Sequence, residues 1–283
     1  MPRLKLFRSE VDDGVVPSTW WDRVFAGDNQ DGRRELRALF PEADVFDTPK
    51  PTQLLKRIIE VATTPNGDDL VLDFFAGSGT TGHAVYESNA ADGGNRRFIL
   101  VQLPEPVDVG GFKSISRITS ERLRRGGRIA KQSNPLFSGD VGFRFFTLDK
   151  SNIRVWSPDS ENLAESLLEH HEHILDGRTE ADIVYELLLK LGLDLCVPME
   201  SRTVAGKSVG AVGGGVLMLC LAEKISAKEV EPIAAGIVAW HKELAPAGDS
   251  TVVFRDSAFA DDVAKTNMAA ILAQNGLENV RSL

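Results

Sequence analysis

The stretch Leu70-Val-Leu-Asp-Phe-Phe-Ala-Gly-Ser-Gly-Thr-Thr-Gly-His-Ala84 decides how this chain of 283 residues begins to fold. An apolar run ends in Asp73, the glycine loop Gly77-Ser78-Gly79 follows, and the next residues have helical character. This order predicts a buried strand, a tight turn and a helix N-terminus. Glycines let a backbone approach a ligand closely, and the first N–H groups of a helix are free to bind one. The stretch therefore predicts a ligand-binding βα turn.

The glycine spacing alone leaves two kinds of ligand open. Gly77, Gly79 and Gly82 also fit the G-x-G-x-x-G fingerprint of dinucleotide-binding folds. Those folds usually place their acidic residue about twenty residues further on, where it binds the ribose. Asp73 instead stands just ahead of the glycines, which favours a ligand that carries a positive charge nearby. NAD bound by a dehydrogenase domain stays the alternative.

The segment from Asp73 to Thr81 resembles the first motif of S-adenosylmethionine-dependent DNA amino-methyltransferases, whose cofactor carries a sulfonium and an α-amino group. Upstream, Phe46–Leu55 opens a predicted helix that runs to about Ala62, with Lys50-Pro51 in its first turn. In the β class of these enzymes, a Lys-Pro motif on such a helix precedes the glycine motif. The resemblance implies that S-adenosylmethionine is bound by Lys50, Pro51, Thr52, Asp73, Phe74, Phe75, Ala76, Gly77, Ser78, Gly79, Thr80 and Thr81.

A second buried strand is predicted in Arg97–Glu105, where a proline ends the apolar run. Members of the family usually carry an acidic residue at this strand end, which binds the ribose hydroxyls of the cofactor. Here the strand end offers Gln102 first and Glu105 three residues later. Both are candidates for the ribose contact, and Glu105 fits a strand-terminating loop equally well.

Further segments resemble one kind of amino-methyltransferase, the modification (Mod) subunit of type III restriction–modification systems. They are the helix-like Ser114–Arg128, Val16–Trp21 near the start, and the C-terminal stretches Val252–Ser257 and Asn279–Ser282. The resemblance covers most of the chain but is highly specific only over residues 46–105. It implies a partial Rossmann-like methyltransferase sheet within an α/β fold, DNA (adenine-N6) methylation, DNA as substrate and a restriction subunit as partner.

The motif that performs catalysis in this family is absent from the sequence. Amino-methyltransferases hold the target nitrogen with an Asp/Asn/Ser-Pro-Pro-aromatic loop, and no Pro-Pro pair occurs here. In the β class that loop lies N-terminal to the cofactor motifs. We therefore expect no catalytic residue in this chain, which would be a fragment, a truncated reading frame or one half of a split pair. Its partner would be the missing N-terminal methyltransferase half or a homologous subunit, and a non-enzymatic assembly role is the alternative.

Composition indicates a folded protein of a reducing compartment. The apolar content is 42%, and no apolar run approaches the roughly twenty residues that span a membrane. Two widely separated cysteines, Cys196 and Cys220, argue against a disulfide framework and favour a cytoplasmic location.

The net charge of −9 arises entirely beyond residue 131, because residues 1–131 carry 19 basic and 19 acidic side chains. A basic helix face is predicted from Arg117, Arg122, Arg124, Arg125, Arg128 and Lys131, and solvation explains it better than DNA binding.

A domain boundary is predicted at 132–142, where Ser, Asn, Pro and Gly gather. Residues 1–131 would form the cofactor-binding part and residues 143–283 a mixed α/β domain for assembly. In the latter we expect strands at Phe143–Leu148, Asn152–Trp156, Thr203–Val212, Val216–Leu221 and Thr251–Arg255, and helices at Asn162–Ile174, Glu180–Leu191, Lys228–Ala245 and Asp261–Asn275. No metal site is expected, because His170 and His173 share only an i, i+3 edge of a predicted amphipathic helix.

Overall fold

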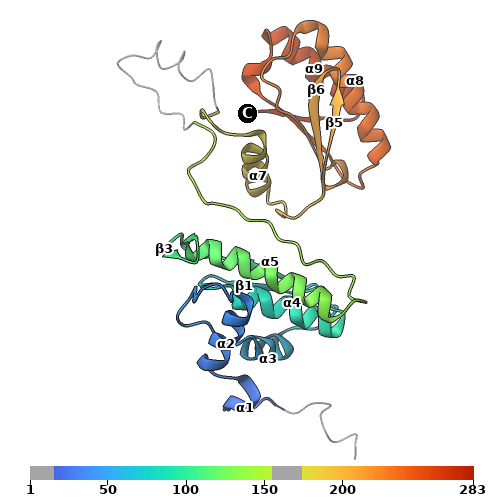
Figure 1. Ribbon diagram of the computed structural model, residues 1–283. Helices are drawn as coiled ribbons and strands as arrows, with labels where there is room; N and C mark the ends of the chain where they lie inside the picture. The colour runs from blue at the N-terminus through green and yellow to red at the C-terminus, as the bar shows by residue number, and fades with distance from the viewer. Residues whose placement is uncertain (1–15, 155–173) are drawn as a thin grey trace, which may run out of the picture. The chain divides into compact units, whose positions relative to one another are not determined.

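The chain folds into two compact units, Met1–Phe145 and Phe146–Leu283 (Figure 1). The computed structural model describes residues 16–154 and 174–283 of them. Both units combine helices with β-sheets, which confirms the mixed α/β class. Among the described helices, none has both the length and the apolar character required to cross a membrane.

The first unit is built around a parallel strand pair with a helix between the two strands. Strands β1 (Leu70–Asp73) and β2 (Arg97–Leu100) pair in parallel, and α4 (Thr80–Asp92) connects them, as expected for a βαβ arrangement. The remaining elements are α1 (Arg23–Ala26), α2 (Asn29–Leu39), α3 (Thr52–Ala62), the antiparallel pair β3 (Pro106–Val109) and β4 (Phe112–Ser114), and α5 (Ile115–Ser133). The helix ending at Ala62 and both strands lie where the sequence predicts them. The second strand is shorter than the predicted Arg97–Glu105, and neither strand is buried as expected, because one face of the pair is open to solvent.

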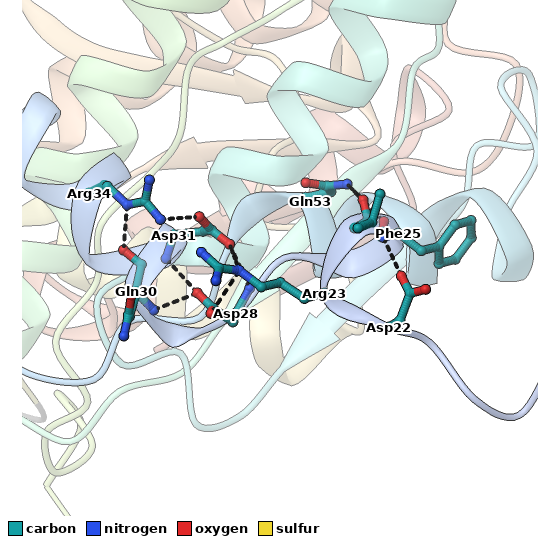
Figure 2. A network of polar contacts seen from close by, with 9 residues as sticks. Asp22, Arg23, Phe25, Asp28, Gln30, Asp31, Arg34 and Gln53 are labelled. Atoms are coloured by element: carbon teal, nitrogen blue, oxygen red, sulfur yellow. Dashed lines mark hydrogen bonds and ion pairs between the residues drawn. The ribbon is translucent and has the colours of Figure 1, made fainter.

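Polar contacts fix the start of the first unit (Figure 2). The Asp28 carboxylate accepts hydrogen bonds from the backbone of the first turn of α2, and the Asp31 carboxylate accepts one from the Asp28 N–H, which completes a capping box. Arg34 donates to Asp31 over 2.7 Å. The Gln53 amide of α3 donates to the Phe25 carbonyl of α1 over 2.8 Å. These bonds attach α3 to the segment before it.

The two faces of the β1–β2 pair differ sharply in their environment. Val71, Phe98 and Leu100 point to one face, where they pack against buried residues of α3, α4 and α5. On the other face, Leu70 and Leu72 are 51% and 58% exposed, and Ile99 and Val101 are similarly open. No described strand pairs with the free edge of β1. Parallel sheets are normally covered on both faces, whereas the described residues leave one apolar face and both outer edges of this strand pair uncovered.

The second unit contains a five-stranded sheet in the order β5-β6-β7-β8-β9. The first three strands are antiparallel to one another and the last three parallel. Two helices, α8 and α9, pack on one face and α7 packs on the other. The bounds are α7 Glu180–Leu191, β5 Met199–Val204, β6 Lys207–Val212, β7 Leu217–Cys220, α8 Ala227–Leu244, β8 Thr251–Phe254, α9 Asp262–Gln274 and β9 Asn279–Ser282.

Most predicted elements of the second unit are confirmed, with two differences. The expected strand Thr203–Val212 is instead the end of β5 and all of β6, because Ala205 and Gly206 have positive φ angles and form a two-residue hairpin turn. Residues 143–148 form no strand. Phe143 packs against the α4–α5 cluster there, and Phe145 lies under the Arg117 guanidinium, so side-chain packing rather than a strand ladder holds this part of the segment.

The remaining boundary segments are only partly described. Of the strand expected at Asn152–Trp156, residues 152–154 form only an isolated bridge between Ile153 and Ile174, and residues 155–156 lie outside the described residues. Nearly all of the helix expected at Asn162–Ile174 lies outside them too. Within the segment 132–142, α5 continues to Ser133, and Phe137 and Val141 pack against the first unit.

Candidate functional site

The glycine loop after β1 is held in a conformation that requires glycine. Gly77 and Gly79 have φ angles of 52° and 84°, in the left-handed region that side chains disfavour. A Cβ atom on Gly79 would also lie 2.9 Å from the Thr119 methyl group of α5. The Gly79 N–H donates to the Ala76 carbonyl over 2.7 Å, which closes the turn directly before α4. The loop therefore leads straight into a helix N-terminus, as the sequence predicts.

Asp73 closes the loop from the strand side. Its carboxylate accepts a hydrogen bond from the Thr81 hydroxyl over 2.5 Å and another from the Phe75 N–H over 3.1 Å. A carboxylate can accept about four hydrogen bonds, so acceptor capacity remains for a ligand. Asp73 thus joins the end of β1 to both the start of the loop and the first turn of α4.

Of the two candidates at the end of β2, only Gln102 contacts the loop. Its side-chain oxygen accepts a hydrogen bond from the Gly77 N–H over 2.7 Å. Glu105 is exposed, and its backbone carbonyl accepts from the Ile115 N–H. The Gln102 side chain therefore supports the loop from β2, whereas Glu105 lies at the base of the β3–β4 pair.

The Lys50-Pro51 turn lies against the glycine loop and α2. The Thr80 hydroxyl donates to the Lys50 carbonyl over 3.3 Å. The Thr52 N–H, at the start of α3, donates to the Glu35 carboxylate of α2 over 2.8 Å. The backbone of this turn passes so close to Gly32 of α2 that a Cβ there would lie 2.4 Å from the Pro49 carbonyl oxygen. The structure thus brings the two sequence motifs together, as predicted.

Three of these supporting residues have no strong sequence signal. Gly32 and Glu35 lie on a polar helix that no motif marks, and Arg122 belongs to the predicted basic face. In the structure Arg122 is fully buried and donates to Ser78 and Thr80 of the loop. Its position four residues after the buried Ile118 was the available signal, because i, i+4 neighbours share a helix face.

The other basic residues of α5 divide into different environments. Arg125 pairs with Glu42 and Glu121 and lies over the Phe40 ring. Arg124, Arg128 and Lys131 line a surface groove of about 700 Å³ together with Phe143 and Phe145. The six cations therefore do not form one continuous solvated face.

Two aromatic side chains of the loop are open to solvent. Phe74 and Phe75 are 63% and 79% exposed, and their ring centroids lie 5.1 Å apart. These two residues follow β1 directly, so the exposed apolar surface of β1 continues to the start of the glycine loop. Trp20 is also exposed, whereas Trp21 packs edge-on against Phe25. His170 and His173 lie outside the described residues.

Comparisons with known proteins agree with the motifs. Residues 4–103 match the family described as DNA methylase. The type III restriction-modification enzyme StyLTI Mod subunit of Salmonella typhimurium is 41% identical over 139 residues, which are 47% of this chain and 21% of that protein. The type II methyltransferase M.KpnI of Klebsiella pneumoniae is 40% identical over 114 residues, 38% of this chain and 26% of that protein. The EcoP15I Mod subunit of Escherichia coli is 37% identical over 128 residues, 42% of this chain and 18% of that protein.

These matches confirm the resemblance to Mod-type DNA methyltransferases that the motifs indicate. They also delimit it, because the chain spans only about a fifth to a quarter of the length of these three relatives.

Proposed function

We propose that this chain, which is related to the Mod subunits of type III restriction–modification enzymes, provides the S-adenosylmethionine-binding portion of a site-specific DNA (adenine-N6) methyltransferase. One observation carries the proposal. The Lys50-Pro51 turn is hydrogen-bonded to the glycine loop, and Asp73 stands at the head of that loop. Both motifs of the resemblance thus meet at the N-terminus of α4. On this proposal β1 and β2 are strands of a Rossmann-like sheet, and α4 is the helix that connects them.

The residues at this site suit a cationic cofactor. Asp73 and the Lys50-Pro51 turn would orient the methionine end, while the loop Phe75–Thr81 would surround it. The exposed rings of Phe74 and Phe75 offer apolar surface to the adenosine part. Bound S-adenosylmethionine supplies an activated methyl group, and this chain's contribution is to hold it in the correct place, since positioning provides much of the rate of such transfers.

The first test measures which cofactor binds. We expect calorimetry to show S-adenosylmethionine binding with a Kd on the order of ten to a hundred micromolar, or about 5.5–7 kcal/mol, and no binding of NAD. Asp73→Ala should weaken binding by roughly 1–3 kcal/mol through loss of a charge-assisted hydrogen bond. Asp73→Asn removes the charge but keeps an oxygen for the Phe75 N–H, and its NH2 group can donate to the Thr81 hydroxyl, so a similar loss in this variant assigns the effect to charge.

Asp69→Ala is the matched control, because Asp69 precedes β1 at the opposite end from the loop and accepts from the Thr64 N–H. We expect its cofactor affinity to equal that of the parent chain. NAD binding as tight as S-adenosylmethionine binding would instead support a dehydrogenase domain.

The bare face and edge of β1 suit the rest of a methyltransferase domain. An unpaired parallel strand with exposed Leu70 and Leu72 is a template for another strand and for covering helices. We propose that the methyltransferase half with the Pro-Pro-aromatic loop, from this or another polypeptide, covers that surface. The complete enzyme would then bind DNA, and a restriction subunit is its proposed further partner. A purely assembly role for this chain is the second candidate, favoured by the acidic second unit.

The second test measures activity. Because the sequence contains no Pro-Pro-aromatic loop, we expect the purified chain to transfer no labelled methyl group to duplex DNA, even with cofactor bound. Adding a polypeptide that carries such a loop should restore transfer and reduce self-association of the chain in analytical ultracentrifugation. Methylation of DNA by this chain alone would contradict the proposal.

A further inference from the structure

Arg122 of α5 carries a positive charge that is buried inside the first unit. Its side chain is fully excluded from solvent. The Nη1 group donates to the Ser78 hydroxyl over 2.9 Å and to the Thr80 hydroxyl over 2.7 Å. The Nε and Nη2 groups have no hydrogen-bond partner among the described residues. Only part of this guanidinium is therefore satisfied, and that part faces the glycine loop.

Such a residue is poorly explained by stability alone. Burying a charge with unpaired N–H groups costs free energy, and an apolar side chain of similar volume is often as good or better for folding. The negative charges of Glu35 and Glu87 offset part of this cost, because both favour the charged form of Arg122. The interaction that remains specific to arginine is the double contact with Ser78 and Thr80.

These contacts continue to the second motif through Thr80. The Thr80 hydroxyl accepts from Arg122 and donates to the Lys50 carbonyl, so one side chain connects α5 to the Lys50-Pro51 turn. Glu35, which attracts Arg122 electrostatically, also binds the Thr52 N–H on the same turn. Arg122 is thus linked to the Lys50-Pro51 turn by hydrogen bonds through Thr80 and by its attraction to Glu35. It is linked to the glycine loop directly, through Ser78.

We propose that Arg122 is a positioning residue, which holds the glycine loop and the Lys50-Pro51 turn in one fixed arrangement before the ligand binds. Pre-organisation of this kind strengthens binding because fewer groups must be ordered in the complex. The identity of the ligand rests on the proposed function, whereas the coupling between the two segments does not. The full chain without ligand can therefore test the coupling.

The test compares Arg122→Met with Arg125→Met in the full chain. We expect Arg122→Met to accelerate amide hydrogen exchange in both 50–52, where the Thr52 N–H reports because Pro51 has none, and 77–81. It should also weaken S-adenosylmethionine binding at least tenfold and leave the urea midpoint unchanged or higher. Arg125 occupies the same helix, pairs with Glu42 and donates to the Leu39 carbonyl. Its replacement should lower the urea midpoint and leave the exchange of the two segments and the affinity unchanged.

Thr80 variants test the path of the coupling. Thr80→Val removes the hydroxyl at nearly constant shape, and it should accelerate exchange at 50–52, whereas Thr80→Ser should behave like the parent chain. The double variant Arg122→Met/Thr80→Val should be no worse than the more affected single variant, because both break the same chain of contacts.

Two results would overturn the proposal. One is Arg122→Met with unchanged exchange in both segments, and the other is a uniform rise of exchange across the first unit with a lower urea midpoint, which denotes a merely structural role. If the parent chain binds no S-adenosylmethionine but Arg122→Met still releases both segments together, the positioning role stands and the ligand assignment fails.

Discussion

Gly32→Ala is expected to destabilise the first unit by about 1–3 kcal/mol, although alanine favours a helix over glycine by about 1 kcal/mol. The added Cβ would lie 2.4 Å from the Pro49 carbonyl oxygen and 2.9 Å from the Pro51 nitrogen. These are backbone atoms of a turn that two prolines stiffen, so the turn must move as a whole. Because the same turn is bonded to Thr80, we also expect weaker cofactor binding. Urea unfolding, with hydrogen exchange in α3 and α4 to locate the loss, measures the effect.

Gly127→Ala provides the matched comparison. Gly127 also lies within a helix, but the nearest neighbours of an added Cβ would be the Val141 Cβ at 3.1 Å and the Val141 carbonyl oxygen at 3.3 Å, which is a much milder approach than at Gly32. We expect a change of less than about 1 kcal/mol, as the gain in helix propensity offsets a mild contact. Equal stability of the Gly32 and Gly127 variants would show that the Lys50-Pro51 turn does not pack as closely against Gly32 of α2 as described.

The two halves of the candidate site were predictable because each depends on local chemistry. The loop Gly77–Gly79 follows from residues that must adopt positive φ angles between a strand and a helix. The α3 helix follows from Pro51 and its apolar face. Their meeting was implied by the resemblance alone, since no local rule places a turn at residue 50 against a hydroxyl at residue 80.

The supporting residues could not be predicted because they act at long range. Glu35 caps a helix that begins seventeen residues later, and Gly32 is required by a backbone approach that only the folded chain contains. By residue type, Arg122 looks like part of a solvated helix face. In the structure it lies on the buried face of α5, so its residue type does not predict its environment. Gln102 was predicted as a candidate for the ribose contact, which stays a prediction, and its hydrogen bond from the Gly77 N–H was not predicted.

In the second unit, the remaining differences trace to single turns. Positive φ angles at Ala205 and Gly206 divide one expected strand into a hairpin. The sequence contains only a weak signal for this turn, because Gly206 is preceded by alanine rather than by Asn, Asp or another glycine. The three glycines 213–215, which all have positive φ angles, reverse the chain between β6 and β7.

The buried imidazole of His83 should make the first unit sensitive to acid. His83 lies on α4 and is 4% exposed. Burial is the main cause that lowers its pKa to about 3, and the positive charges of Arg122 and Lys56 act in the same direction. Glu87 lies 3.3 Å from its Nε2, but that carboxylate is also 3.3 Å from the Lys56 ammonium, which competes for its charge. The folded state therefore holds this histidine neutral.

The sign of the pH effect follows from this lowered pKa. Between the ordinary histidine pKa of about 6.5 and about 3, the unfolded chain binds a proton that the folded chain does not, so stability falls as the pH falls through this range. At about 1.4 kcal/mol per pH unit, the loss between about pH 6.5 and about pH 4.5 is roughly 2–3 kcal/mol. Above about pH 7 this contribution is constant.

His83→Gln isolates the effect, because glutamine is polar and does not titrate. The difference in unfolding free energy between the parent chain and this variant should be flat above about pH 7 and should decline steadily below about pH 6.5. Carboxylates with lowered pKa values, such as Asp92 beside Arg96, contribute equally to both proteins and cancel in the difference. If the two proteins lose stability in parallel, His83 becomes protonated within the folded chain, and Glu87 rather than burial determines its charge.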